Sequence, residues 1–498
     1  MSKATPSGFQ EAPPVYFSDV FEVAPETVDA YGAFDIALVN DLPLFVDPFL
    51  LFDSEEEKYR SLHDSIIKYL VFLKDRAVAG DLNEGTIQQW LTFGEVKQNW
   101  LGFSKTGNGG TGLGPHFGKA LARNLASVFK NFGTETLTAS SHIEKLGLLS
   151  GGVGRDHLSD FTTNLIKGFL AKYTEDFGRA HLQPHQMRSF KVDKVVFDFT
   201  TRRWKAETFQ LPFHQGDFVL LTPKEILTRE EAWINRSDML DQFTQVQIAI
   251  GDDALRHQIN AHFMSQINEQ TTNEERKLAI LDTYERFEEL VDLYIKGKEE
   301  DAPQAHVTSG RKVHETAVQF IENVRTLIQD HLAGTEFCSE KADSLDESRR
   351  RVVYLRHVIE DNDGYRLFYV DGKPIKREAD LHVMFRLTWF GTSYDVNSEV
   401  NNGRGPVDYK VSIGKRNASL VEFKLASNTG LEKNLRKQVA IYEKASNTVK
   451  SLKVILFFTD AEQSKLQRIL KELNLDRDTN VIAIDARADN KPSASKAT

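Results

Sequence analysis

Three charged residues in the last quarter of the sequence could act together chemically. Asp408 ends the run GRGPVD, and Glu422 and Lys424 follow within LVEFKL. Side chains two positions apart on a β-strand point to one face, so Glu422 and Lys424 share a face while Phe423 points to the other. Two close carboxylates repel each other unless a cation lies between them, and oxygen ligands suit Mg²⁺. We predict that Asp408, Glu422 and the backbone carbonyl of Phe423 bind this metal.

The chemistry that such a site would support is hydrolysis of a phosphodiester. Bound Mg²⁺, with Mn²⁺ as the alternative, acidifies an attacking water and neutralises charge on the phosphate. The ammonium of Lys424 can orient that water or stabilise the developing charge. An exposed cross-strand pair is the structural alternative, but charges at the centre of otherwise apolar strands are costly unless they are used.

The elements that must position these residues alternate along the C-terminal region. Helical patterns cover residues 375–388, 431–444 and 461–473, and strand patterns cover 394–400, 407–413, 419–425, 452–458 and 481–484. A turn at residues 414–417 would fold the strand of Glu422 back onto the strand that begins beside Asp408. We therefore expect a mixed sheet flanked by helices.

This order of elements, with Asp408 and Glu422-Phe-Lys424 on its strands, resembles the PD-(D/E)xK phosphodiesterase superfamily over residues 376–460. The resemblance implies a restriction-endonuclease-like domain. One departure is that the proline stands two positions before Asp408, with Val407 between them.

Further site residues are implied by the same resemblance. Gln438 and Tyr442 share a helix face and resemble the Gln-xxx-Tyr element of the recombination-exonuclease branch, where such residues contact the nucleic acid or brace the site. Glu378 lies on the first helix, where members often carry another acidic metal ligand. Asp380 and Glu399 are rivals for that role.

A basic stretch surrounds the motif in an otherwise acidic protein. Residues 401–453 hold 11 Lys/Arg against 4 Asp/Glu, whereas the chain has a formal net charge of -10. Such an island suits a phosphate backbone held at one place, and a solvated basic face is the alternative. The candidate nucleic-acid contacts are Arg404, Lys410, Lys415, Arg416, Lys433, Arg436 and Lys437.

The chain of 498 residues is long enough for two or three domains. We predict an α/β fold class, of the mixed α+β multidomain kind. Its segments would be a flexible arm (1–14), an N-terminal α/β module (15–250), a helical middle (251–360), the nuclease-like domain (361–487) and a disordered tail (488–498).

Local patterns support this division. In the N-terminal module, residues 34–38 have strand character, 59–74, 119–129 and 157–173 are helical, and 192–200 with 204–211 form a hairpin. The middle region shows long charged helices at 253–270, 273–298, 313–332 and 344–360, with breaks at 270–272, 301–310 and 334–339. The chain has one cysteine, no apolar leader and no apolar run of membrane-spanning length, so we expect a cytoplasmic protein.

Four other polar motifs carry weaker signals. The glycine-rich run 107–114 resembles an ATPase lid but lacks the partner motif, so a loop before a helix is expected. Asp156 is expected to cap the helix after it. His181, His185 and His214 do not have zinc-ligand spacing. Asp35, Asp41 and Asp47 are expected in a turn-rich loop rather than in a second acidic site.

The leading functional hypothesis is a Mg²⁺-dependent nuclease acting on DNA or on an RNA such as tRNA. The architecture resembles single-chain anti-phage defence nucleases, in which the remaining module senses a trigger such as a phage protein. A restriction-like endonuclease that reads a DNA feature is the enzymatic alternative, and paired cuts on a duplex would favour a homodimer. A non-catalytic binding protein with a nuclease fold is the third hypothesis.

Overall fold

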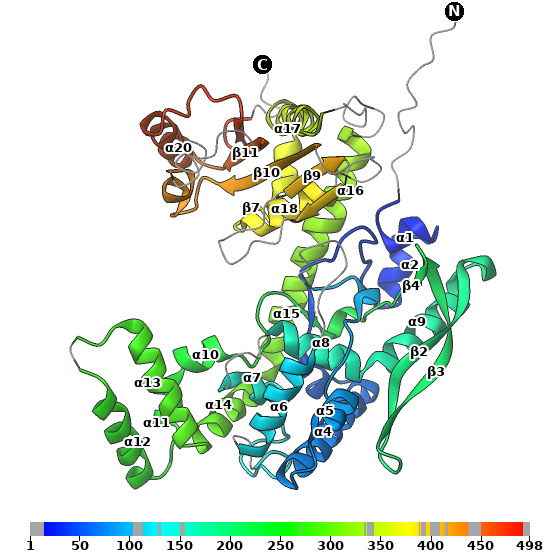
Figure 1. Cartoon of the computed structure of the whole chain (residues 1–498). Helices are drawn as coiled ribbons and strands as arrows, with labels where there is room; N and C mark the ends of the chain where they lie inside the picture. Colours follow the sequence, from blue (N-terminus) through cyan, green and yellow to red (C-terminus); the bar gives the residue numbers. More distant parts are fainter. Residues whose placement is uncertain are drawn as a thin grey trace, which may run out of the picture.

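The structure is a computed structural model that describes residues 14–102, 113–127, 131–149, 155–268, 270–332, 335, 343–387, 389, 395–398, 409–413, 417–436 and 450–491. Figure 1 shows the C-terminal sheet and its helices above a larger part formed by the N-terminal and middle regions. The chain is a mixed α/β protein with several sheets, as expected. No helix within the described ranges is both long and apolar enough to cross a membrane.

The C-terminal sheet has five strands in the order β12-β11-β10-β9-β8. Strands β8, β9 and β10, which come first along the chain, form an antiparallel meander. Strand β11 pairs in parallel with β10, and β12 pairs in parallel with β11. The predicted order of helices and strands is confirmed, with a helical turn at residues 431–436. The elements are α18 (Glu378–Leu387), β8 (Asp395–Ser398), β9 (Tyr409–Ile413), β10 (Asn417–Leu425), β11 (Lys450–Phe457), α20 (Asp460–Glu472) and β12 (Val481–Asp485).

Helices cover both faces of this sheet. Val421 and Phe423 face α18 and α17 (Ser344–Asp361), where Phe385 packs 4.5 Å from the ring of Phe423. Ile455 and Phe457 face the other way, against α20 and the turn at residues 431–436. We placed α17 in the helical middle region, but it packs on the sheet because its apolar face is buried against β10 and β12.

The N-terminal module is mostly helical. The predicted hairpin is confirmed as β2 (Met187–Asp198) and β3 (Arg203–His214), which pack on α9 (Lys167–His181). The helical segments are α1 (Phe17–Val20), α2 (Pro25–Ala30), α3 (Pro48–Phe52), α4 (Glu57–Val78), α5 (Glu84–Trp90), α6 (Pro115–Ser127), α7 (Lys145–Leu148) and α8 (Arg155–Leu165). The remaining short strands are β1 (Phe45–Val46), β4 (Asp217–Phe218) and β5 (Leu227–Thr228).

Two predictions for this module were wrong in detail. The strand expected at residues 34–38 forms only isolated bridges, because its buried backbone pairs in turn with Val15, Phe17 and Thr222 rather than with one strand. The single helix expected at residues 157–173 is two helices, α8 and α9, which meet at Ile166.

The middle region forms its own apolar core. This core is formed by α12 (Asp253–Gln266), α13 (Asn273–Arg286) and α14 (Glu289–Glu300), together with α10 (Arg236–Asp241) and α11 (Phe243–Ile248), which precede the predicted boundary at residue 250. Phe49 and Leu50 of α3 pack into that core, so the N-terminal and middle regions are joined by apolar contact.

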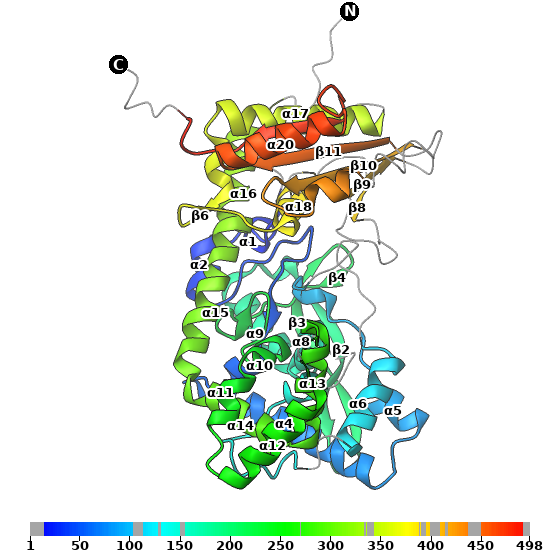
Figure 2. The ribbon, with the colours of Figure 1, turned by 90° about the vertical axis from the view of Figure 1, so that its left-hand side faces the viewer.

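A long helical segment leads from the middle region to the C-terminal sheet (Figure 2). It consists of α15 (Ala302–Ala317), the π-helix η4 (Val318–Glu322), α16 (Asn323–Thr326) and the π-helix η5 (Leu327–Leu332). The break predicted at residues 301–310 is confirmed only at Asp301, because the proline after it lies in the first turn of α15, where its missing N–H costs little.

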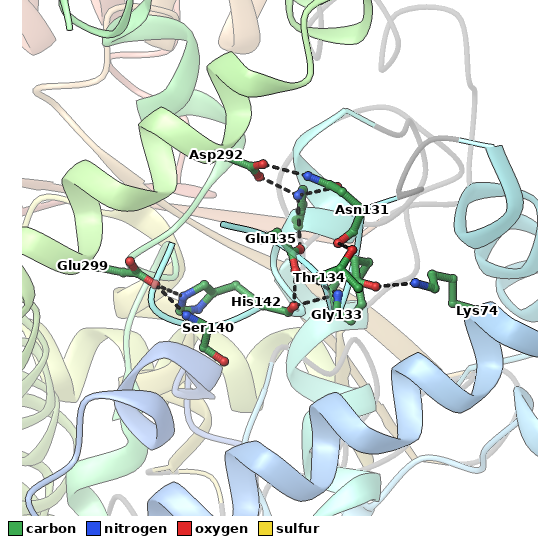
Figure 3. A network of polar contacts seen from close by, with 12 residues as sticks. Lys74, Asn131, Gly133, Thr134, Glu135, Ser140, His142, Asp292 and Glu299 are labelled. Carbon is green, nitrogen blue, oxygen red and sulfur yellow. Dashed lines mark hydrogen bonds and ion pairs between the residues drawn. The ribbon is translucent and has the colours of Figure 1, made fainter. Parts of the chain in front are cut away.

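A buried polar network fixes the N-terminal module to α14 (Figure 3). The Lys145 ammonium lies 2.6 Å from Asp292 Oδ1 and 3.2 Å from Glu135 Oε1. Both pairs are almost fully shielded from solvent, with the Lys145 side chain 3% exposed. His142 Nε2 adds a second link, 2.8 Å from Glu299 Oε1. A buried cation therefore compensates two buried carboxylates here.

Replacing Lys145 by Met should destabilise the protein strongly. The change leaves the carboxylates of Glu135 and Asp292 buried without their cation, which costs about 3–5 kcal/mol of unfolding free energy. Chemical denaturation should measure this loss. Lys277→Met is the matched control, since Lys277 pairs with Glu274 at the surface and its loss should leave the midpoint almost unchanged. Equal effects of the two substitutions would contradict the importance of this network.

Candidate active site at the end of strand β10

The candidate site lies where β10 extends past Tyr409, the first described residue of β9, while its other edge stays paired with β11 as far as Leu425. Tyr409 of β9 pairs with Val421, and past that point α18 supplies hydrogen bonds to the β10 backbone. His382 Nε2 lies 3.2 Å from the carbonyl oxygen of Phe423. The N–H of Leu425 donates to Glu378 Oε1 at 3.1 Å. Side chains of α18 therefore satisfy backbone groups that a neighbouring strand would otherwise satisfy.

Glu378 also organises the charged groups of the site. Its Oε1 accepts a second hydrogen bond from Asn428 Nδ2 at 2.8 Å, and its Oε2 lies 3.7 Å from Lys424 Nζ. The side chains are 13% exposed for Glu378 and 4% exposed for Lys424. A buried ammonium is tolerated because a carboxylate lies beside it and is itself held by two N–H donors.

Glu422 lies on the same face of β10 as Lys424 and is also buried. The parallel register places Glu422 opposite Lys453 of β11, another buried lysine. We did not single out Lys453 from the sequence. Its signal was a lysine within the otherwise apolar residues 452–457 of β11, the same kind of signal that identified Glu422 and Lys424.

His382 is a neutral hydrogen-bond donor at this site. Burial, together with the nearby positive charge of Lys424, lowers the pKa of His382 from 6.5 to about 3. Because a carbonyl oxygen can only accept, the proton must be on Nε2 to bond Phe423. Sequence reasoning missed His382, although its spacing of four from Glu378 places both on one helix face.

The structure brings together four of the predicted site residues: Glu378, Glu422, Phe423 and Lys424. Lys433 and Arg436 are exposed on the helical residues 431–436, where Arg436 pairs with Glu432 at 2.8 Å. The backbone of Lys410 lies in β9, opposite Leu420. The residues that lie outside the described part of the chain are Asp408, Gln438, Tyr442, Glu399, Arg404, Lys415, Arg416 and Lys437.

The described donors suit a hard cation but form only part of a metal site. The carboxylates of Glu378 and Glu422 and the carbonyl of Phe423 are oxygen ligands of the kind that Mg²⁺ takes. His382 uses one lone pair of that carbonyl and leaves the other. Within the described residues, no group of three or more His, Cys, Asp or Glu side chains is placed to hold a metal ion.

Asp380 does not lie at the candidate site. Its Oδ1 is 2.5 Å from a guanidinium nitrogen of Arg229 in the N-terminal module. The idea that Asp380 could replace Glu378 as a metal ligand is therefore wrong, because the two side chains leave α18 in different directions and Asp380 is committed to an arginine.

The three aspartates at residues 35–47 do not form one site, as expected. Asp35 accepts hydrogen bonds from Ser18, and Asp47 caps α3 and accepts the N–H of Trp233. Asp41 is buried, and burial with the nearby charge of Glu95 raises its pKa well above the usual value.

The other weak motifs are also distributed through the module. Asp156 lies inside the first turn of α8 rather than at its cap position. Burial, with the carboxylates of Glu95 and Asp156, raises the pKa of Asp160 to about 7. The ring of His181 packs against Phe177. Residues 103–112 of the glycine-rich loop are outside the described residues, and α6 follows them as predicted.

Comparison with known families finds two separate matched regions, one on each side of residues 236–343. Residues 22–235 match a domain of unknown function (DUF8370), and residues 344–460 match another domain of unknown function (DUF8371). Neither the curated proteins nor the solved structures give a match. The second match begins at the start of α17 and contains α18 and β8 to β11, which agrees with the packing of α17 on the sheet.

The neutral state of His382 predicts acid sensitivity. Its folded pKa of about 3 lies below its ordinary value of 6.5, so only the unfolded chain binds this proton as the pH falls between them. Stability is therefore lost as the pH falls below 6.5, by about 2 kcal/mol between pH 8 and pH 5. His382→Gln keeps an N–H donor without this titration.

The two proteins should be compared by denaturation at several pH values. The difference in unfolding free energy between the wild type and His382→Gln should change by about that 2 kcal/mol across the range. A difference that stays constant with pH would show that His382 is not buried in its neutral form.

Proposed function

We propose that this protein is a Mg²⁺-dependent nuclease of the PD-(D/E)xK type, acting on DNA or RNA. The observation that carries the proposal is the burial of Glu422 and of the Glu378–Lys424 pair at the end of β10. Charges at that depth in a sheet are costly, and they cluster at functional sites for that reason. The helix–three strands–helix–strand order around them is the support from the fold.

The residues of this site would have distinct roles. Glu422, the Phe423 carbonyl and Asp408 would hold the metal, which when bound supplies an acidified water and neutralises phosphate charge. Lys424 would orient the attacking water or stabilise developing charge, and its ammonium is already held beside a carboxylate. Gln438 and Tyr442 would position the strand.

Glu378 would act mainly by holding Lys424 in place. Its Oε1 is committed to the N–H groups of Leu425 and Asn428, so only Oε2 remains for a metal or for the lysine. We therefore expect Glu378 to give at most one oxygen to the metal shell.

We further propose that the nuclease is an anti-phage effector whose N-terminal module senses a trigger. Two observations support this proposal. One chain carries both the sheet with the candidate site and a larger module, and Arg229 of that module bonds directly to Asp380 of α18. A restriction-like enzyme would instead use the N-terminal module to read DNA. Degradation of RNA alone by the purified protein would exclude that alternative.

Replacing Glu422 by Gln should abolish nuclease activity with little change in fold. The substitution removes one anionic metal ligand and keeps the side-chain volume, so cleavage should fall by about 100-fold or more. The protein should be incubated with plasmid DNA and with total RNA, in Mg²⁺, in Mn²⁺ and in EDTA. Glu472→Gln, which changes a glutamate that is paired on the surface of α20, is the matched control. Metal-independent cleavage, or full activity of Glu422→Gln, would contradict the proposal.

Replacing both Lys433 and Arg436 by Ala should weaken binding of nucleic acid without stopping hydrolysis. Both side chains are exposed. Each phosphate contact that is lost should make the negative slope of log affinity against log salt less steep by about one. Fluorescence anisotropy of a labelled oligonucleotide over a salt series should show that the double variant has a slope less steep than that of the wild type by about two. An unchanged slope would place the nucleic acid elsewhere.

A further inference from the structure

The first turn of α18 is held from two directions. Glu378 and His382 bond to the end of β10, as described above. Arg377, which directly precedes α18, and Asp380, in its first turn, bond instead to residues of the N-terminal module. A shift of this turn in response to the N-terminal module would therefore also move Glu378.

The stronger of the two outer contacts is a buried ion pair. Asp380 Oδ1 lies 2.5 Å from a nitrogen of Arg229, and both side chains are 7% exposed. Arg229 also lies 3.3 Å from Gln319 Oε1, and its guanidinium is 5.4 Å from the centre of the Phe320 ring. Such a pair fixes geometry because moving one partner would leave the other charge buried alone.

The second outer contact is adjacent and more exposed. Arg377 lies 2.8 Å from Glu230 Oε1, with side chains 32% and 48% exposed. Consecutive residues of the N-terminal module, Arg229 and Glu230, therefore bond to Asp380 in the first turn of α18 and to Arg377 directly before it. This pairing of opposite charges defines one orientation of the turn.

The same junction includes a π-helical turn. Gln319 and Phe320 belong to η4, and the hydroxyl of Tyr16 donates to the carbonyl oxygen of Phe320 at 2.5 Å. Short π-helical segments often occur at functional sites in helices. Tyr16 and Arg229, both from the N-terminal module, thus meet α18 and the long helix at one place.

We propose that the N-terminal module sets the position of Glu378, and through it Lys424, by means of the Arg229–Asp380 and Glu230–Arg377 pairs. Arg229 is then a positioning residue, and a partner that displaces residues 229–230 would switch the site. The effect on catalysis rests on the proposed nuclease function, whereas the effect on the position of Glu378 does not. The two matched regions, 22–235 and 344–460, each contribute one half of both pairs.

The first test measures position without using activity. Hydrogen exchange of a peptide containing Leu425 reports on the bond between its N–H and Glu378. In the double variant Arg229→Met/Asp380→Leu both buried charges are removed, so the fold should persist. We expect exchange at Leu425 to accelerate by about tenfold. Arg377→Gln, at the more exposed pair, should give a smaller acceleration and does not threaten folding.

Lys145→Met is the control for general destabilisation, because it breaks a buried ion pair that does not involve α18. It should leave exchange at Leu425 close to that of the wild type under native conditions. If the double variant and Arg377→Gln both exchange like the wild type at Leu425, or if Lys145→Met accelerates Leu425 equally, the proposal is overturned.

The second test separates this inference from the proposed function. If the wild type cleaves nucleic acid, the double variant should change the rate at saturating substrate by about tenfold and leave KM for the oligonucleotide near its wild-type value. If neither the wild type nor the double variant, in which the Arg229–Asp380 contact is removed, cleaves DNA or RNA, the nuclease proposal fails, and exchange at Leu425 still decides whether the N-terminal module positions Glu378. An altered KM with an unchanged rate would show that Arg229 acts on substrate binding instead.

Discussion

The burial of charge at the end of β10 is the constraint on which the C-terminal part depends. Lys424 cannot be buried alone, and Glu378 compensates it at 3.7 Å while accepting N–H groups from Leu425 and Asn428. Since Glu378 lies on α18, that helix must begin beside the end of the strand. The apolar contact of Phe385 with Phe423 then holds the rest of α18 on the sheet. Polar and apolar contacts therefore require the same helix position.

The helix α18, whose position is fixed by these contacts, also contacts the N-terminal module. One apolar core extends from Val15 to Ala486 and includes the long helical segment, so the sheet and the N-terminal module do not fold around separate interiors. At their junction the contacts are charged, with Arg229 against Asp380. Core contacts set how the parts pack, and the ion pairs set how α18 is turned within that packing.

Local patterns in the sequence were sufficient for part of this result. Strand periodicity placed Glu422 and Lys424 on one face, and alternation of apolar runs predicted the order of helices and strands along the chain, because both are properties of neighbouring residues. Asp380 could not be separated from Glu378 in this way, since its partner lies 151 positions away. The continuous helix through Gly310 was missed because tertiary packing outweighed the helix-breaking tendency of glycine.

The kind of contact at the junction bears on how a trigger could act. An apolar interface would resist opening in proportion to its area, whereas a buried ion pair adds little net stability and is costly only when one partner is left alone. A ligand can shift such an equilibrium only by its differential affinity for the two arrangements. A partner that offers a carboxylate to Arg229, or a cation to Asp380, would meet that condition directly. A partner that replaces the charged contacts of residues 229 and 230 would therefore change the site at a smaller cost in free energy than separation of the apolar core would require.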